Sequence, residues 1–459
     1  MTTAFVSNSA CAHRTCGPIT AACLGLMAIA PSVWALAPGE DGVTVTIPVS
    51  GISDTAQAVA IDPDGSIVLA GSAGGNYSAL TRVTPTGALD PNFGTLGIAT
   101  PDFSSSVGGD GQRALVRMGD GRYVGCGRFN SPTTGNDFVV ARFKSDGSLD
   151  PTFNGSGYAV TPFTSSASQE QCNAVALQTD GMIVSAGYSS GGGHVHVALT
   201  RHTALGQLDS NFGSGGELVI DASATLSGDS EARALLVQAD GKLLVAGYAV
   251  GAGSDDFLVM RLNAVDGSPD SNFGTNGITR TPIGTSEDIA NAMVLQSDGR
   301  IVLAGSAYAA DGHRDFALAR YTTAGVLDST TFGIGGKVTT PVGPSDDYAY
   351  ALLVMPWGRF VAAGSARIST GGPGTDLAIV AYNADGSLDR YFGINGKRML
   401  NISTLDDIAY GLVSDIGGTR LWAVGTAAPG MNPNQDFLAV EFGLPDTIFR
   451  HGFETATAP

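Results

Sequence analysis

The chain has 459 residues, enough for several ordinary domains or for one large repeat array. Only 14% of the residues are charged, and 42 Asp and Glu against 24 Lys and Arg give a formal net charge of -18. This balance excludes a general nucleic-acid binder, which needs basic surface, and argues against docking on anionic lipid. A hydrophobic content of 43% excludes an intrinsically disordered chain.

The N-terminal segment has the features of an export signal. Arg14 precedes an apolar run over residues 19–30, which is too short for a membrane-spanning helix of about 20 residues. Ala35 and Ala37 supply the small residues of a signal-peptidase site, so residues 1–37 are predicted to be a signal peptide, with cleavage after Ala35 as the alternative. We expect a secreted, periplasmic or cell-surface protein without a membrane span.

Two of the five cysteines, Cys126 and Cys172, lie beyond this segment. Both occupy positions that the other repeats described below give mostly to Ala. One interpretation is a disulfide between neighbouring repeats, which an oxidising compartment permits, and the other is a pair of buried free thiols. Two cysteines are too few for a Cys-based zinc site.

An Asp-Gly turn followed by an apolar strand recurs through the chain. The clearest copy is Asp298-Gly299 followed by residues 301–305, and the copies at Gly358 and Gly418 are weaker. The spacing of 56 to 60 residues predicts a repeat architecture before any local structure is considered. The aligned glycines are Gly65, Gly121, Gly181, Gly241, Gly299, Gly358 and Gly418.

Each repeat contains four short segments typical of β-strands, which in the fifth repeat are residues 292–296, 301–305, 315–321 and 336–342. The Asp-Gly turn favours a hairpin because Gly adopts positive φ without a steric clash. The continuously apolar second segment is typical of a strand buried on both faces. A Leu-Asp-x-x-Phe-Gly motif precedes the fourth segment, and its Asp is expected to hydrogen-bond its own turn.

Seven such units predict an all-β fold, a seven-bladed β-propeller of four-stranded antiparallel blades. The propeller is expected to span residues 38–453 and to leave a short tail at 454–459. A parallel β-helix is the alternative for a Gly-rich repeat, but its coils are usually far shorter than 59 residues.

The two ends of the chain complement each other. The last repeat has a third strand at 436–440 and then stops without a fourth, whereas residues 42–49 match the fourth strand at 337–342. We therefore expect residues 42–50 to pair into the last blade and close the ring.

The repeat resembles the delta-60 repeat, a predicted β-propeller repeat of unknown function in bacterial secreted and surface proteins. The resemblance rests on the turn 238–242, the strand end 245–247, the segment 256–261 and the Leu-Asp-x-x-Phe-Gly motif, and it covers residues 42–453. The sixth and seventh repeats depart from it, because Ala381 and Glu441 replace the strand Arg. The resemblance implies export and a propeller architecture, and it carries no activity.

Acidic residues open the first strand of most repeats. A ring of carboxylates around a central channel could bind Ca²⁺, since this cation prefers oxygen ligands. The alternative is that each acid caps its own turn or pairs with the Arg of a repeated third strand (Arg82, Arg142, Arg201, Arg261 and Arg320). The candidate residues are Asp54, Asp110, Glu170, Asp288, Asp347 and Asp407.

Four residues outside the repeat pattern are candidate site residues. His194 and His196 share a strand face and could chelate a metal, or could belong to an exposed polar face. Trp357 and Trp422 could form a sugar-binding platform, although buried packing is the simpler interpretation.

The sequence contains no His-Glu-x-x-His and no phosphate-binding loop. We therefore expect a monomeric, non-catalytic protein without a cofactor, which binds an extracellular or envelope protein or glycan through its variable inter-strand loops. The alternative is a propeller hydrolase or lyase acting on an extracellular polymer.

Overall fold

The computed structural model describes most of the chain after residue 31, within one compact unit. Its elements are all β-strands over the described ranges, and no helix there is suited to crossing a membrane. The predicted Asp110 and Trp357 lie outside these ranges. The ranges are 32–35, 43–74, 77–103, 111–163, 168–191, 193–223, 228–251, 253–356, 358–367, 374–415, 417–428 and 434–443.

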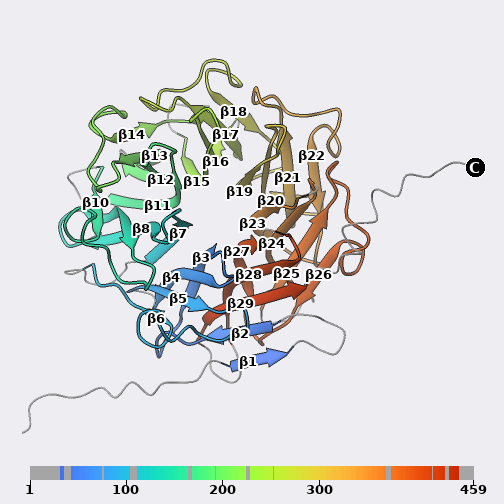
Figure 1. Cartoon of the computed structure of the whole chain (residues 1–459). Helices are drawn as coiled ribbons and strands as arrows, with labels where there is room; N and C mark the ends of the chain where they lie inside the picture. The colour runs from blue at the N-terminus through green and yellow to red at the C-terminus, as the bar shows by residue number, and fades with distance from the viewer. Residues whose placement is uncertain are drawn as a thin grey trace, which may run out of the picture. The chain divides into compact units, whose positions relative to one another are not determined.

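Single repeats form four-stranded antiparallel sheets with the strands in chain order (Figure 1). The first contains β3 (Thr55–Ile61), β4 (Ile67–Ala73), β5 (Tyr77–Val83) and β6 (Ile98–Ala99). The fourth contains β15 (Ser230–Val237), β16 (Leu243–Val250), β17 (Asp255–Leu262) and β18 (Ile278–Thr281). The fifth contains β19 (Asp288–Leu295), β20 (Ile301–Tyr308), β21 (Arg314–Tyr321) and β22 (Lys337–Thr340). The sixth contains β23 (Tyr348–Val354), β24 (Phe360–Ala366), β25 (Asp376–Tyr382) and β26 (Lys397–Leu400).

The second and third repeats share one larger sheet. The second contributes β7 (Gly111–Arg117), β8 (Tyr123–Ser131), β9 (Gly135–Phe143) and β10 (Tyr158–Thr161). The third contributes β11 (Ser168–Leu177), β12 (Ile183–Gly191), β13 (His194–His202) and β14 (Glu217–Ile220). They merge because the start of β11 pairs in parallel with the start of β9.

The last repeat combines strands from both ends of the described chain. It contains β27 (Ile408–Ser414), β28 (Arg420–Ala427) and β29 (Asp436–Gly443), and β2 (Val43–Ile47) pairs antiparallel with β29 from Thr44↔Val440 to Ile47↔Phe437. A further strand, β1 (Ser32–Ala35), pairs with the outer edge of β2. Cleavage after Ala35 or Ala37 would remove β1 and leave four strands, as in the single-repeat sheets.

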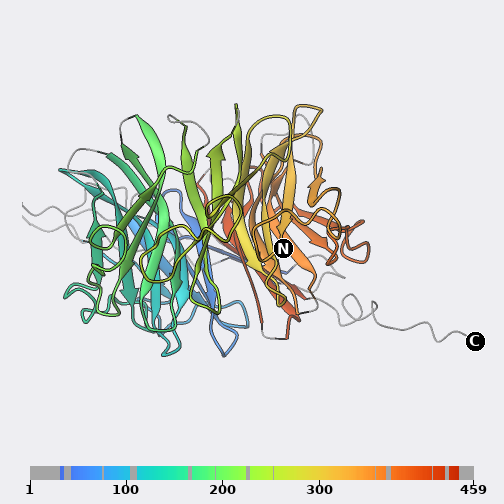
Figure 2. The same cartoon turned by 90° about the horizontal axis from the view of Figure 1, so that it is seen from above.

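The first strand of each repeat lies nearest the centre of the unit (Figure 1). β3, β7, β11, β15, β19, β23 and β27 contact one another in this order, and β27 also contacts β3. Seen at right angles to this view, the strands of neighbouring sheets lie roughly along the same axis (Figure 2). Side chains that leave the first strands toward the centre therefore approach one another.

The second strand of each repeat forms the core between sheets. In β20, Ile301 and Leu303 pack toward the fourth repeat, whereas Val302 and Ala304 pack toward the sixth. All four side chains are fully buried. This two-sided burial explains why the strand is continuously apolar rather than alternating, and it confirms the sequence-based prediction.

Each of the first five repeats is joined to the next by the Phe of its Leu-Asp-x-x-Phe-Gly motif and the residue after it, and we call this motif the latch. In the fourth repeat the buried ring of Phe273 lies under Gly325 of the fifth, where a Cβ would come within 2.6 Å of the ring. Gly274 N donates a hydrogen bond of 2.9 Å to Ala324 O in the same turn. Gly325 also has a φ of 75°, which favours Gly there. The Phe-Gly pair of the motif therefore holds the following repeat.

The Asp of this motif connects its own turn to the strand Arg. Asp270 Oδ1 accepts a hydrogen bond from Asn272 N, as the sequence predicts, and Oδ2 accepts from Arg261 Nε at 2.8 Å. Lys242 Nζ donates to the same Oδ2 at 2.7 Å and lowers the pKa of Asp270 to about 2. The Arg261 guanidinium lies 4.7 Å from the Phe273 ring centroid, so charge and ring stabilise each other.

The strand Arg also reaches into the next repeat. Its Nη1 donates to a turn carbonyl there, so one guanidinium connects a strand, the motif and the following sheet. The last repeat reverses the charges: Glu441 stands at the strand position and pairs with Arg420, whose Nη2 donates to Pro85 O of the first repeat. The regular contacts are Arg142 to Ala204 O, Arg201 to Ala264 O, Arg261 to Thr323 O and Arg320 to Ala384 O.

Candidate ligand-binding site on the central axis

Each first strand carries a β-bulge opposite a Gly within the second strand. In the fifth repeat the ladder passes from Ala290↔Gly305 to Ala292↔Ala304 and omits Asn291. A Cβ on Gly305 would lie 1.8 Å from Ile289 O, so no other residue permits this approach of the two backbones. A bulge re-aims the extra residue, and here it turns that side chain toward the centre.

The bulge residue varies from repeat to repeat, whereas most of the residues that flank it are Ala. The seven described bulge residues are Gln57, Arg113, Asn173, Arg233, Asn291, Tyr350 and Tyr410. The opposing glycines are Gly71, Gly127, Gly187, Gly247, Gly305, Gly364 and Gly425.

All seven bulge residues line one cavity of about 410 Å³, together with Gln171, Tyr188 and Glu231. The volume falls within the range of about 300–1,000 Å³ that is usual for small-molecule sites. The lining contains amides, guanidinium groups and phenols, and no aliphatic residue. We call it the axial cavity.

Hydrogen bonds hold one side of the axial cavity in place. Glu231, 9% exposed, accepts from Arg233 Nε at 3.2 Å and from Asn173 Nδ2 at 3.0 Å. Arg233 Nη1 donates to Asn291 Oδ1 at 2.7 Å, and Gln171 Nε2 donates to Asn173 Oδ1 at 2.7 Å. The single carboxylate among the lining residues is therefore already paired.

Arg113, on the other side, is bound only by a neutral group in the described structure. Its Nη1 donates to Gln57 Oε1 at 3.1 Å, and no ion pair joins it to a described carboxylate. Glu231, which already pairs with Arg233, attracts it more weakly than burial and Arg128 act against its charge. Its side chain is accessible to solvent, yet the surrounding walls displace much of the bulk water. This desolvation, together with the nearby Arg128, lowers the pKa of Arg113. The positive charge of Arg113 is therefore poorly solvated, and no described carboxylate pairs with it.

Two tyrosines from the sixth and seventh repeats form an aromatic wall. The rings of Tyr350 and Tyr410 have centroids 5.0 Å apart and are tilted by 49°. Tyr348 stacks on Tyr350 at 6.1 Å with nearly parallel planes. Burial raises the pKa of Tyr350 and of Tyr410, so both phenols are hydrogen-bond donors at neutral pH.

The acidic residues predicted to open the first strands cap their own turns. Asp347, for example, is fully buried, and its Oδ2 accepts from Val342 N at 2.7 Å and Gly343 N at 2.9 Å. The repeated Arg residues pair instead with the Asp of the latch. In the described ranges no three His, Cys, Asp or Glu side chains gather as a metal site requires. The other described capping acids are Asp54, Glu170, Asp288 and Asp407.

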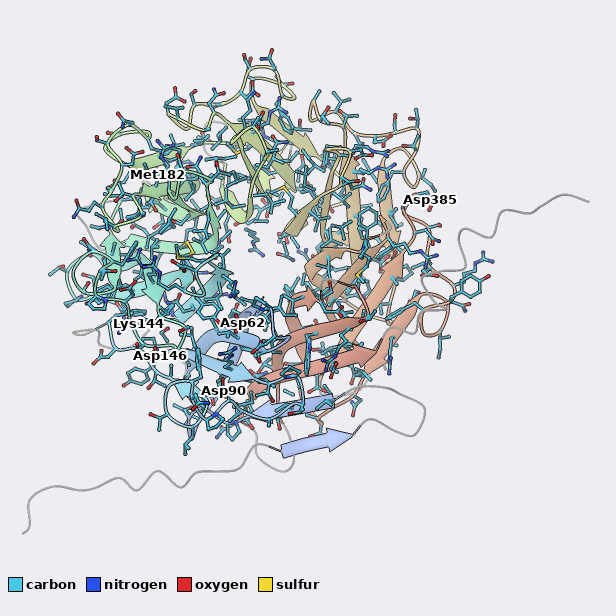
Figure 3. All side chains as sticks on the ribbon, in the orientation of Figure 1. Asp62, Asp90, Lys144, Asp146, Met182 and Asp385 are labelled. Carbon is cyan, nitrogen blue, oxygen red and sulfur yellow. A yellow bond between two sulfur atoms is a disulfide. The ribbon has the colours of Figure 1, made fainter. Side chains whose placement is uncertain are left out.

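Cys126 of β8 and Cys172 of β11 form a disulfide between the second and third repeats, with a Cα–Cα distance of 5.8 Å. Figure 3 shows it as the yellow bond between two sulfur atoms. The two half-cystines therefore connect the same pair of repeats that share the larger sheet.

The remaining sequence candidates do not contribute to the axial cavity. The rings of His194 and His196 lie 6.5 Å apart, and each faces a different carboxylate, Asp229 and Asp221 respectively. Trp422 is 1% exposed and belongs to the core of the last sheet, so it is a packing residue.

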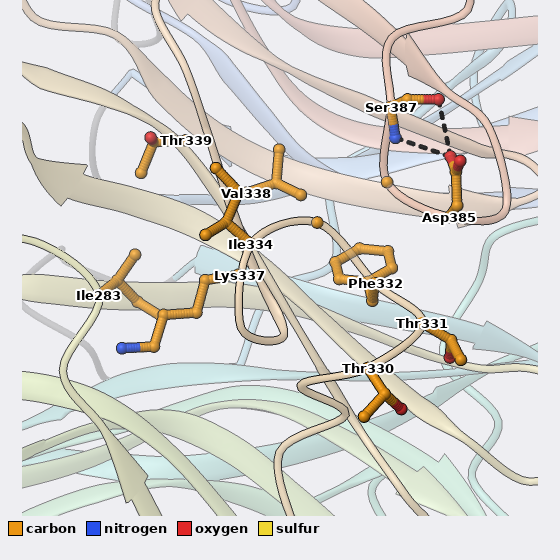
Figure 4. A pocket seen from close by; sticks show the side chains of 12 residues that line it. Ile283, Thr330, Thr331, Phe332, Ile334, Lys337, Val338, Thr339, Asp385 and Ser387 are labelled. Carbon is orange, nitrogen blue, oxygen red and sulfur yellow. Dashed lines mark hydrogen bonds between the residues drawn. The ribbon is translucent and has the colours of Figure 1, made fainter.

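Two further cavities lie along the latches. One of about 720 Å³ lies between the fifth-repeat latch and the turn at Asp385 (Figure 4), where Ser387 Oγ donates to Asp385 Oδ1 at 2.7 Å. The other, of about 820 Å³, surrounds Asp389, which pairs with Arg359 at 2.9 Å. Both are lined largely by repeated motif residues, so we assign them to the fold rather than to a ligand.

Sequence reasoning missed the axial cavity, although a signal was present. The bulge residue precedes the Gly of the second strand by 14 positions in six repeats and by 15 in the last. At this position every repeat has a polar or aromatic residue. The inward orientation of these residues is hard to predict because a bulge shifts the two-residue periodicity on which strand prediction depends.

Comparison with known families identifies the repeat. Residues 63–93, 119–153, 238–273 and 296–330 match the model described as "Domain of unknown function (DUF5122) beta-propeller". These four segments are therefore similar to the repeats of a β-propeller family. The matched segments run from the Asp-Gly turn to the latch, and together they cover under a third of the chain. No curated protein matches the chain.

Solved structures with similar folds include several propellers of low sequence identity. The WD40 repeats of RRP9 match with 9% identity and a TM-score of 0.48, over 90% of this chain and 100% of that one. The polysaccharide lyase Uly1 matches with 8% identity and a TM-score of 0.48, over 85% and 90%. Virginiamycin B lyase from Staphylococcus aureus matches with 12% identity and a TM-score of 0.45, over 88% and 100%.

Proposed function

We propose that this protein is an exported, non-catalytic β-propeller that binds a carbohydrate in its axial cavity. The observation that carries the proposal is the convergence of seven variable bulge residues on one cavity. Repeated Gly residues fix the backbone at these positions, and the side chains are left to differ. Amides and phenols are suited to the hydroxyl groups and ring faces of a sugar.

The proposal includes a closed ring of seven blades of the delta-60 type, spanning residues 38–453 and followed by the tail at 454–459. Pairing of β2 with β29, the contact of β27 with β3 and the hydrogen bond from Arg420 to Pro85 O support it. Residues 1–37 would act as the signal peptide, and the mature protein would work outside the cytoplasm as a monomer without a cofactor. Variable loops at the rim would contact the rest of a larger glycan or an envelope protein.

The alternative is a hydrolase or lyase acting on an extracellular polymer. A glycoside hydrolase needs two carboxyl groups, whereas Glu231 is the single one among the lining residues and is paired with Arg233. Tyr410 is held protonated by burial, so it is not poised as a base. These features favour binding over catalysis.

Co-sedimentation with separated cell-envelope fractions over a salt series tests the proposal. The full chain is compared with Gln57→Trp and Asn173→Trp, which fill the axial cavity, and with Gln207→Trp, which changes an exposed turn residue. We expect saturable binding to a glycan fraction, retained by Gln207→Trp and weakened about tenfold by both cavity variants. Equal binding by all four proteins would refute the axial site, and release of shorter saccharides would establish the enzyme.

A further inference from the structure

We propose that the ligand of the axial cavity is an acidic sugar, bound with its carboxylate at Arg113 and its ring against Tyr410 and Tyr350. This inference rests on the proposed function, and it specifies the substrate class of the same site. It follows from three properties of the cavity: its charge, the position of its aromatic wall and the chemistry of its lining.

The charge of the cavity opposes that of the protein. Two Arg and one Glu line it, whereas the whole chain carries 42 acidic and 24 basic residues. Glu231 is paired with Arg233, so the positive charge of Arg113 is the one left available. Low-dielectric walls strengthen the attraction of this charge for an anion. A carboxylate could take two parallel hydrogen bonds from the guanidinium.

The aromatic wall lies within reach of the same ligand. Going round the axis, Tyr350 and Tyr410 belong to the sixth and seventh repeats, and Gln57 and Arg113 to the first and second. Arg113 partly offsets the rise in the pKa of Tyr410 that burial causes, so the two side chains lie near enough to interact across this arc. A ring packed against the tyrosines can therefore place an attached carboxylate at Arg113 and a hydroxyl at Gln57.

The remaining lining selects a sugar over a peptide. Asn173, Gln171 and Asn291 present amide groups, which both donate and accept hydrogen bonds and so suit hydroxyls. None of the ten lining residues is aliphatic, so an apolar peptide side chain would find no matching surface. Among the described lining residues, one Arg without an ion pair stands beside phenol rings and amides, and this combination matches a hexuronic acid.

Isothermal titration calorimetry with trigalacturonic acid and its fully methyl-esterified form tests the inference. The two probes share their rings and differ in charge. The full-length wild type is compared with Arg113→Gln, Arg113→Lys and the exposed Arg390→Gln, which changes the net charge equally but lies away from the axial cavity. Melting temperatures of the variants establish that each is folded. A glucuronate-containing tetrasaccharide and its ester repeat the comparison for the other common uronic acid.

We expect the acid to bind about tenfold more tightly than the ester, and Arg113→Gln to abolish this preference. Arg113→Lys should retain part of this preference, and Arg390→Gln should bind both probes as the wild type does. Added salt should weaken binding of the acid and leave binding of the ester unchanged. Equal binding of acid and ester, with both lost in Gln57→Trp, would overturn the acidic-sugar inference and leave the carbohydrate site standing. Failure of every saccharide, neutral or acidic, to bind would overturn both.

Discussion

Removing the disulfide between Cys126 and Cys172 should destabilise the protein without disturbing its packing. The two residues are separated by 46 positions. Closing a loop of this length reduces the conformational entropy of the unfolded chain and so raises its free energy by about 4 kcal/mol at 25 °C. Ala is the natural replacement, because it occupies each position in five of the other six repeats. The double variant Cys126→Ala/Cys172→Ala therefore loses the cross-link and leaves little cavity.

The expected change in melting temperature is modest because the unit is large. An unfolding entropy of about 2.1 cal/mol/K per residue over roughly 400 residues converts 4 kcal/mol into a shift of about 5 °C. Calorimetric melting of the oxidised wild type, of the wild type refolded in reductant and of the double variant measures it. Reductant should lower the melting temperature of the wild type and leave that of the double variant unchanged. Equal melting temperatures in all three, or alkylation of both Cys126 and Cys172 in the oxidised protein, would refute the reasoning.

The remaining predictions concern the latch, the buried acids and the strand shared by the chain ends. Phe273→Ala should cost about 3–5 kcal/mol in a urea titration because the ring is fully buried, whereas Ile334→Ala, at a site 91% exposed, should cost almost nothing. Burial raises the pKa of Asp347 to about 6 from 3.8, so its protonated form stabilises the fold below pH 4, and about 3 kcal/mol is lost as the pH rises through 6. Asp347→Asn should flatten that part of the stability–pH curve, and an unchanged slope would contradict the assignment. Deleting residues 43–47 should lower the melting temperature by removing a row of ladder bonds worth about 0.5–1.5 kcal/mol each, and an unchanged value would exclude their structural role.

The parts of the fold that the sequence predicts depend on local chemistry. Gly299 marks a hairpin because its φ of 83° suits Gly, and the apolar run after it marks a strand buried on both faces. Four antiparallel strands per repeat follow from these two signals. The hydrogen bond from Asn272 N to Asp270 Oδ1 was likewise predictable, because an Asp side chain in a turn commonly accepts from the backbone N–H two residues later.

The parts that the sequence concealed depend on contacts between strands or repeats. Gly305 looks like an ordinary strand end, and only the approach of Ile289 O shows that it creates a bulge. Asn291 therefore looked like an unremarkable strand residue. The pairing of Arg261 with Asp270 rather than with a first-strand acid was equally hidden, because it is decided by which turn lies beneath the strand.

Pairing of β2 with β29 has a consequence for how the protein is made. Thr44 emerges early in synthesis, and its partner Val440 follows 396 residues later. At about 5–20 residues per second, this strand waits on the order of 20 to 80 s for the edge it will join. Earlier repeats can fold against their neighbours as they appear, but the first repeat keeps one open side until the seventh repeat has been synthesised. Until then the edge of β2 that pairs with β29 has no partner from its own sheet, and such an edge can pair with other chains.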